Sequence, residues 1–151
     1  MKQNQTPESL DFLLANISHL HRSLARQQLE ALKLYCGQPP LLHALWRQEG
    51  LTQKALAEEL RISPATLTKM LQRMEKAGFI QRQVNPEDQR VSFVFLTDAG
   101  RHIQSQVKQV WQTMEQEVFA GFSIEEQAIL RQFLLRIRDN LLKATGEAPW
   151  K

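Results

Sequence analysis

A chain of 151 residues, 42% hydrophobic and 23% charged, has the length and balance of a folded protein with one domain or two closely joined lobes. Its first ten residues lack the apolar run of a secretion signal, and no apolar stretch approaches the ~20 residues that span a bilayer. These features predict a cytoplasmic protein with no membrane partner, and its single cysteine, Cys36, excludes a disulfide within the chain.

The net charge of +3 is concentrated in one short stretch. Residues 61–90 carry six basic and three acidic side chains, whereas the rest of the chain carries 13 of each. A local cationic patch on an otherwise neutral chain predicts a polyanionic partner, such as a nucleic acid.

Two helices are predicted in the first third of the chain. Residues 8–34 form the first, because apolar side chains recur there at steps of three and four. Gly37 and the two prolines that follow it end this pattern. A shorter helix is predicted over residues 40–48, and Gly50 ends it.

A tight pair of helices follows. Thr52 is a capping residue and predicts a third helix over residues 53–60. Ser63 with Pro64 behind it predicts the start of a fourth helix, because a hydroxyl caps the first turn and proline suits its first position. The inward face of the fourth helix is then apolar, with helical spacing: Leu67, Met70, Leu71 and Met74.

The period then changes to that of a β-hairpin. Residues 79–84 and 91–96 are predicted strands, and a polar turn sequence that includes Asn85 and Pro86 separates them. Thr97 caps a long helix over residues 98–120. Ser123 caps the last helix, and the following Glu126 completes a capping box.

Two short helices followed directly by a hairpin predict a winged helix-turn-helix, in which the second helix enters the DNA major groove. With the apolar stripe facing inward, the outer face combines small, hydroxyl and basic side chains that suit phosphates and base edges. These residues are Ala65, Thr66, Thr68, Lys69, Gln72, Arg73 and Lys76.

The hairpin tip predicts a wing. Arg90 lies at its base, and Asp88, two residues earlier, is placed to orient the guanidinium toward a narrow minor groove. The alternative is a pair that only stabilises the turn.

Residues 51–100 resemble the MarR family of bacterial winged-helix regulators. The resemblance rests on Ser63, Thr66 and Gly78 of the fourth helix, on the wing sequence from Asn85 to Arg90, and on the Leu-Thr-x-x-Gly exit into the long helix. The flanking helices fit as well. Met74 stands where the family usually has leucine, a change that conserves volume.

The resemblance implies a mainly α fold with a small β-hairpin wing and an obligate homodimer on double-stranded DNA. Residues 8–34 and 101–144 would form a helical dimerisation lobe, and residues 35–100 the DNA-binding lobe. The implied DNA contacts are Gln53, Ser63, Pro64, Ala65, Thr66, Thr68, Lys69 and Arg73, with Arg90 at the wing position and Asp88 as its partner. A two-fold dimer that covers promoter DNA would most simply act as a repressor on a pseudo-palindromic operator.

Family members often respond to small aromatic or anionic effectors. The corresponding region here includes His19, Tyr35, His43, Trp46 and Arg47, which would suit a planar carboxylate. The alternative is that these side chains pack and hydrogen-bond between lobes.

Other chemistry has little support in the sequence. Cys36 is interpreted as an ordinary small residue, with redox sensing as the alternative. The four histidines are scattered, so neither a metal site nor a cofactor is predicted, and no nucleophile and base pair indicates an enzyme. A winged-helix adaptor that docks an acidic protein, and a non-specific architectural DNA binder, remain alternative functions.

Overall fold

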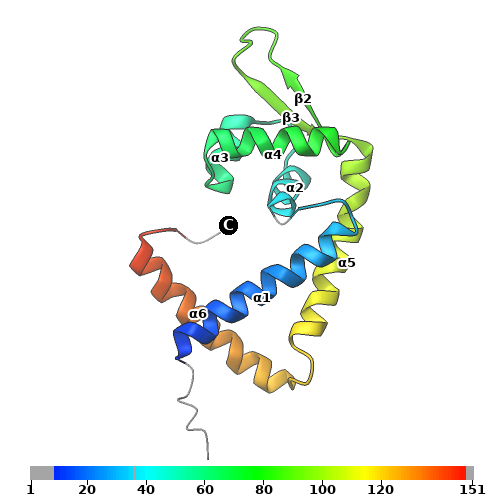
Figure 1. The fold of residues 1–151 in the computed structure, drawn as a ribbon. Helices are drawn as coiled ribbons and strands as arrows, with labels where there is room; N and C mark the ends of the chain where they lie inside the picture. The colour runs from blue at the N-terminus through cyan, green and yellow to red at the C-terminus, as the bar shows by residue number, and fades with distance from the viewer. Residues whose placement is uncertain (1–8, 36, 149–151) are drawn as a thin grey trace, which may run out of the picture. The chain divides into compact units, whose positions relative to one another are not determined.

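The computed structural model describes residues 9–35 and 37–148, which contain six helices and a three-stranded sheet (Figure 1). The chain divides into two compact units, residues 1–114 and 115–151. The predicted fold class, mainly α with a small β wing, is confirmed. Within the described residues, no helix is both long and apolar enough to cross a membrane.

Helix α1 (Leu10–Glu30) is shorter than the predicted helix over residues 8–34. The Ser9 hydroxyl accepts a hydrogen bond from the Phe12 amide at 3.1 Å and fixes the start. At the other end Lys33 has a φ of 58°, and the Leu34 amide donates back to the Leu29 carbonyl at 3.0 Å. This left-handed C-terminal turn is usually made with glycine, so a lysine at this position does not predict it.

Helix α2 (Gln38–Arg47) begins two residues before its predicted start. Both prolines lie in the first turn, where proline is tolerated because those amides have no helical partner in any case. Leu41, Leu42 and Leu45 are fully buried.

Helices α3 (Gln53–Leu60) and α4 (Pro64–Lys76) begin where the capping residues predict. The Thr52 hydroxyl accepts from the Ala55 amide, and the Ser63 hydroxyl accepts from the Thr66 amide, each at 3.1 Å. Capping chemistry therefore located both helices of the pair from sequence alone.

The sheet has one strand more than predicted. Strands β2 (Ile80–Val84) and β3 (Ser92–Leu96) form the expected hairpin. A two-residue strand, β1 (Leu51–Thr52), pairs with the other side of β3, so the order is β1-β3-β2 and both pairs are antiparallel. Two residues are too few to show a strand period in the sequence.

Helix α5 (Asp98–Val118) starts in close contact with the end of α4. The Thr97 hydroxyl accepts from the Gly100 amide at 3.1 Å and donates to the Gly78 carbonyl at 2.5 Å. A Cβ atom at Gly100 would overlap the carbonyl oxygen of Phe79. The Gly100 carbonyl in turn accepts from the Trp46 indole at 2.8 Å, so glycine allows three segments to meet at this point.

The first unit has one continuous apolar core, to which α1 to α5 and the sheet all contribute. The predicted inward face of α4 lies in it: Leu67, Leu71 and Met74 are buried, and Met70 is partly buried against the cluster. This core holds the outer face of α4 and the hairpin in one rigid setting.

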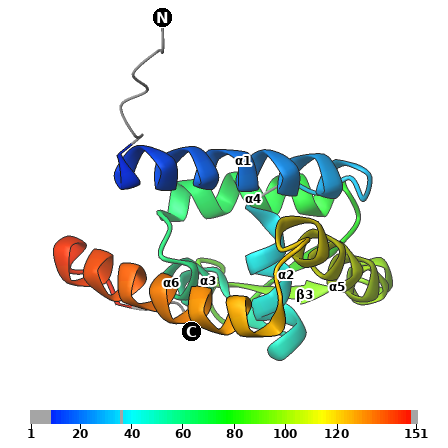
Figure 2. The same ribbon diagram turned by 90° about the horizontal axis from the view of Figure 1, so that it is seen from below.

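Helix α6 (Ile124–Thr145) forms most of the second unit as one continuous helix (Figure 2). Its start carries the predicted capping box, in which Ser123 and Glu126 each accept from the other's amide. No residue of α6 is buried, although its face carries many large apolar side chains.

Candidate nucleic-acid interface

The turn between α3 and α4 sets the second helix across the first. Arg61 has a φ of 54°, and the Ile62 amide donates to the Ala57 carbonyl at 3.1 Å, which ends α3 within one residue. The two helices contact one another and share the core through Leu56 and Leu67. Figure 1 shows α4 beside the β2–β3 hairpin, the arrangement of a winged helix-turn-helix.

The outer face of α4 has the predicted character. Ala65, Thr66, Lys69, Gln72, Arg73 and Lys76 are exposed. Thr68 is only half-buried, and its hydroxyl donates to the Pro64 carbonyl at 2.8 Å. The basic residues of this 13-residue helix therefore share one open face with small and polar side chains. A surface of this kind suits the DNA major groove.

The first turn of α4 offers fewer backbone donors than a helix start usually does. Pro64 has no amide hydrogen, and the Thr66 and Leu67 amides donate to the side chain and carbonyl of Ser63. Among the described residues, only the Ala65 amide of this turn has no partner in the chain. Ser63 and Thr66 also join their hydroxyls at 2.9 Å.

The wing is a tight turn stabilised by side chains of its own. The Asn85 carboxamide accepts from the Glu87 amide, and the Asp88 carboxylate accepts from the Arg90 amide, each at 3.0 Å. Asp88 therefore holds the main chain of Arg90, and within the described residues no bond joins it to the guanidinium. The Arg90 side chain is exposed and ready to contact a partner.

A cation counted in the basic stretch is neutralised in the fold. The Arg82 guanidinium on β2 donates to a Glu75 carboxylate oxygen at 2.7 and 3.1 Å, and the Arg82 amide donates to the other oxygen at 3.2 Å. Hydrogen bonding to the Arg82 side chain holds the pKa of Glu75 below its ordinary value. The pair ties the end of α4 to the wing, and no local sequence pattern predicts it.

The remaining predicted contact, Gln53, is half-buried in the first turn of α3. Ser63 and Pro64 are exposed at the start of α4. The structure thus brings most predicted DNA contacts to α4 and the wing and sets Gln53 one helix away.

Three of the five residues predicted to line an effector pocket have partners within the chain. The half-buried Trp46 donates to Gly100, Arg47 pairs with Glu59, and Tyr35 faces Arg73. His19 on α1 and His43 on α2 are exposed. Tyr35 lines a cavity of about 560 Å³ with Lys33, Arg73 and Lys76, and none of the other four lines it.

Two further sequence interpretations concern redox and metal chemistry. Cys36, interpreted as an ordinary small residue, lies outside the described residues. In the described part of the chain, no three histidine, cysteine, aspartate or glutamate side chains gather closely enough to hold a metal ion.

These features define a DNA-binding protein of the winged helix-turn-helix class. A model of the MarR family matches residues 37–92. The chain is 31% identical over 149 residues to the uncharacterized HTH-type transcriptional regulator YwaE of Bacillus subtilis (strain 168), covering 93% of this chain and 87% of that protein. It is 33% identical over 101 residues to YdgJ, a second such regulator of that organism, covering 67% of this chain and 62% of that protein.

The fold comparison agrees with the sequence comparison. A crystal structure of MarR superposes with a TM-score of 0.74 at 28% identity and covers 89% of this chain and 98% of that chain. The chain belongs to the MarR family of transcriptional regulators.

Proposed function

We propose that this regulator binds a pseudo-palindromic operator as a homodimer and represses transcription by covering promoter DNA in the cytoplasm. The observation that supports this proposal most directly is the open face of α4, where Lys69 and Arg73 stand exposed beside the small Ala65. Small residues let the helix approach the bases, and basic side chains supply hydrogen bonds to guanine or phosphate.

In this proposal the DNA-binding lobe takes residues 35–100. The contacts are those expected from sequence on α4, with Gln53 and Ser63 near phosphates and Arg90 in the adjacent minor groove. Asp88 then contributes by shaping the wing turn, since its carboxylate holds the Arg90 amide.

The homodimer is supported by apolar surface that the described chain leaves uncovered. Ile129, Phe133 and Leu141 on α6 are each more than half exposed, as are Leu10, Phe12, Ile17 and Leu20 on α1. Contiguous apolar faces of this kind mark interaction surfaces in stable proteins. A second copy that supplies residues 8–34 and 101–144 would bury them, and a two-fold dimer would read half-sites about ten base pairs apart.

The experiment is selection of duplexes from a random-sequence pool by the purified full-length protein. We expect enrichment of an inverted repeat, followed by tight binding in a fluorescence-anisotropy titration and much weaker binding to a shuffled duplex. Equal affinity for both duplexes would instead indicate a non-specific architectural DNA binder. No binding to any duplex would contradict the proposed function and favour a protein–protein adaptor.

The proposed function includes release from DNA by a small effector. His19, Tyr35, His43, Trp46 and Arg47 would line the pocket for a small aromatic or anionic molecule. A thermal-shift screen with salicylate-like acids tests it, because a ligand that binds the folded state raises the unfolding midpoint. A flat response throughout the screen would remove the effector from the proposal.

A further inference from the structure

Tyr35 lies in the loop between α1 and α2, and its ring lies outside the apolar core. The side chain is 58% exposed. Its main chain, however, is clamped by Gln38, which is only 3% exposed. The Tyr35 amide donates to the Gln38 side-chain oxygen at 3.0 Å, and the Gln38 amide donates to the Tyr35 carbonyl at 2.9 Å. An exposed aromatic ring is therefore mounted on a fixed base.

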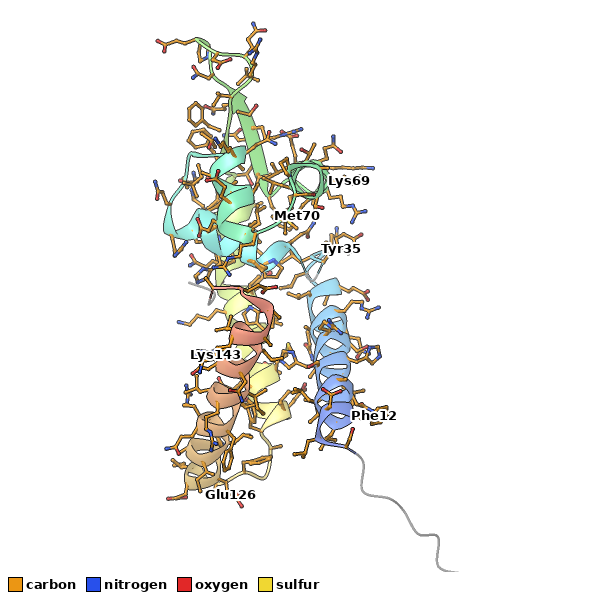
Figure 3. All side chains as sticks on the ribbon, turned by 90° about the vertical axis from the view of Figure 1, so that its left-hand side faces the viewer. Phe12, Tyr35, Lys69, Met70, Glu126 and Lys143 are labelled. Atoms are coloured by element: carbon orange, nitrogen blue, oxygen red, sulfur yellow. The ribbon has the colours of Figure 1, made fainter. Side chains whose placement is uncertain are left out.

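The loop that carries Tyr35 packs closely against α4. A Cβ atom at Gly37 would lie 3.2 Å from the terminal methyl of Met70. Tyr35 also lines a cavity of about 210 Å³ together with Thr66, Lys69 and Met70 of α4. Figure 3 shows Tyr35 near Lys69 and Met70 of α4.

The ring faces one particular cation of α4. The guanidinium carbon of Arg73 lies 5.9 Å from the centroid of the Tyr35 ring, within the ~6 Å range of a cation–π contact. Such a contact uses the ring's π face and leaves the N–H groups of the guanidinium free to donate. Among the described residues, no hydrogen bond or ion pair engages those donors.

We propose that Tyr35 is a positioning residue for DNA binding, which holds the Arg73 guanidinium over its ring so that the N–H groups face DNA in advance. The inference rests on the proposed function, since it assumes that α4 enters a groove. A flexible arginine side chain loses conformational entropy when it binds DNA. An arginine that the ring already restrains in the free protein loses less entropy on binding.

The size of the effect follows from the geometry. An exposed cation–π contact near its distance limit contributes about 0.5–1 kcal/mol, which corresponds to about a two- to fivefold change in affinity. Loss of the ring should therefore weaken DNA binding by that factor, but only when Arg73 is present.

The experiment is a double-mutant cycle on the full-length protein, measured by fluorescence anisotropy with a duplex selected by the wild-type protein. Tyr35→Leu should weaken binding about two- to fivefold, whereas Tyr35→Phe should bind like wild type because it keeps the ring. In the Arg73→Gln background, Tyr35→Leu should have no further effect. Lys69→Gln is the matched control on the same face, and in that background the Tyr35→Leu loss should persist in full.

The outcomes separate the inference from the proposed function. If Tyr35→Leu causes the same loss with and without Arg73, or if Tyr35→Phe is as weak as Tyr35→Leu, Tyr35 does not act through its ring on Arg73. Unchanged binding of Tyr35→Leu, with an unchanged thermal midpoint, would also overturn the inference. If wild-type protein selects no duplex, the proposed function fails, and this inference falls with it.

Discussion

The Glu75 carboxylate and the Arg82 guanidinium connect helix α4 to the wing. Arg82 donates to both carboxylate oxygens, through its side chain at 2.7 Å and its main chain at 3.2 Å. The Glu75 side chain is 37% exposed and the Arg82 side chain 27%, so solvent screens the pair only in part. An ionised carboxylate thus adds a second connection between α4 and the hairpin, besides the apolar core that they share.

This ion pair predicts a pH dependence of stability. The pKa of Glu75 is lowered from its ordinary 4.5 by hydrogen bonding to Arg82. A carboxyl group with a lowered folded-state pKa stabilises the fold above its unfolded pKa, and the contribution is lost as pH falls through the folded value. Urea unfolding should show Glu75→Gln destabilised by about 1 kcal/mol or less at pH 7. The difference from wild type should shrink below pH 4.5, and a difference that grows in acid would contradict this account.

Gly100→Ala should destabilise the protein by about 1–3 kcal/mol, the usual range for an added group in a packed site. The new methyl group would overlap the Phe79 carbonyl oxygen, which is backbone and cannot turn away. Thermal unfolding by circular dichroism measures the change. Ala99→Ser, at the exposed neighbouring position, is the control and should unfold near the wild-type temperature.

Arg90→Ala should weaken binding to selected and shuffled duplexes alike, because an arginine in the minor groove reads shape and charge more than base identity. The slope of log affinity against log salt should fall by about one. Gln89→Ala changes the neighbouring exposed residue without removing charge and should leave the slope unchanged. If Arg90→Ala matched wild type at every salt concentration, the wing would make no DNA contact.

Leu134→Glu should turn the proposed homodimer into monomers. Leu134 is 43% exposed and lines an apolar cavity of about 560 Å³ with Phe119 and Leu130 in the second unit. A carboxylate there would be costly to bury against a second copy. Light scattering after size exclusion gives the mass, and Gln132→Glu adds the same charge at a neighbouring exposed position as a control. A Leu134→Glu protein that keeps the dimer mass would place the interface elsewhere.

Features encoded by neighbouring residues were predictable. Thr52 and Ser63 fixed the starts of α3 and α4 to the residue, because a hydroxyl cap acts within three positions of its own. The apolar spacing of Leu67, Leu71 and Met74 separated the buried face of α4 from its open one. The helix-turn-helix and its exposed surface therefore follow from local patterns.

Features made by contacts between distant segments were not predictable. Strand β1 exists because Leu51 pairs with Val94, and neither residue alone indicates the bridge. The Tyr35 ring faces Arg73 across 38 positions of sequence, a contact that no local pattern indicates. The sequence left two roles open for Asp88, and its bond to the Arg90 amide is the turn-stabilising one, which depends on the turn's own geometry.

The order of the sheet also bears on how the protein avoids self-association through its wing. Unpaired strand edges are templates for aggregation between molecules. One edge here is β1, which has only two residues, and the other is β2, whose middle carries Gln81, Arg82 and Gln83. The strand rich in valine and phenylalanine, β3, is enclosed between them. A projecting hairpin can thus remain available to DNA at high protein concentration without joining the sheets of its neighbours.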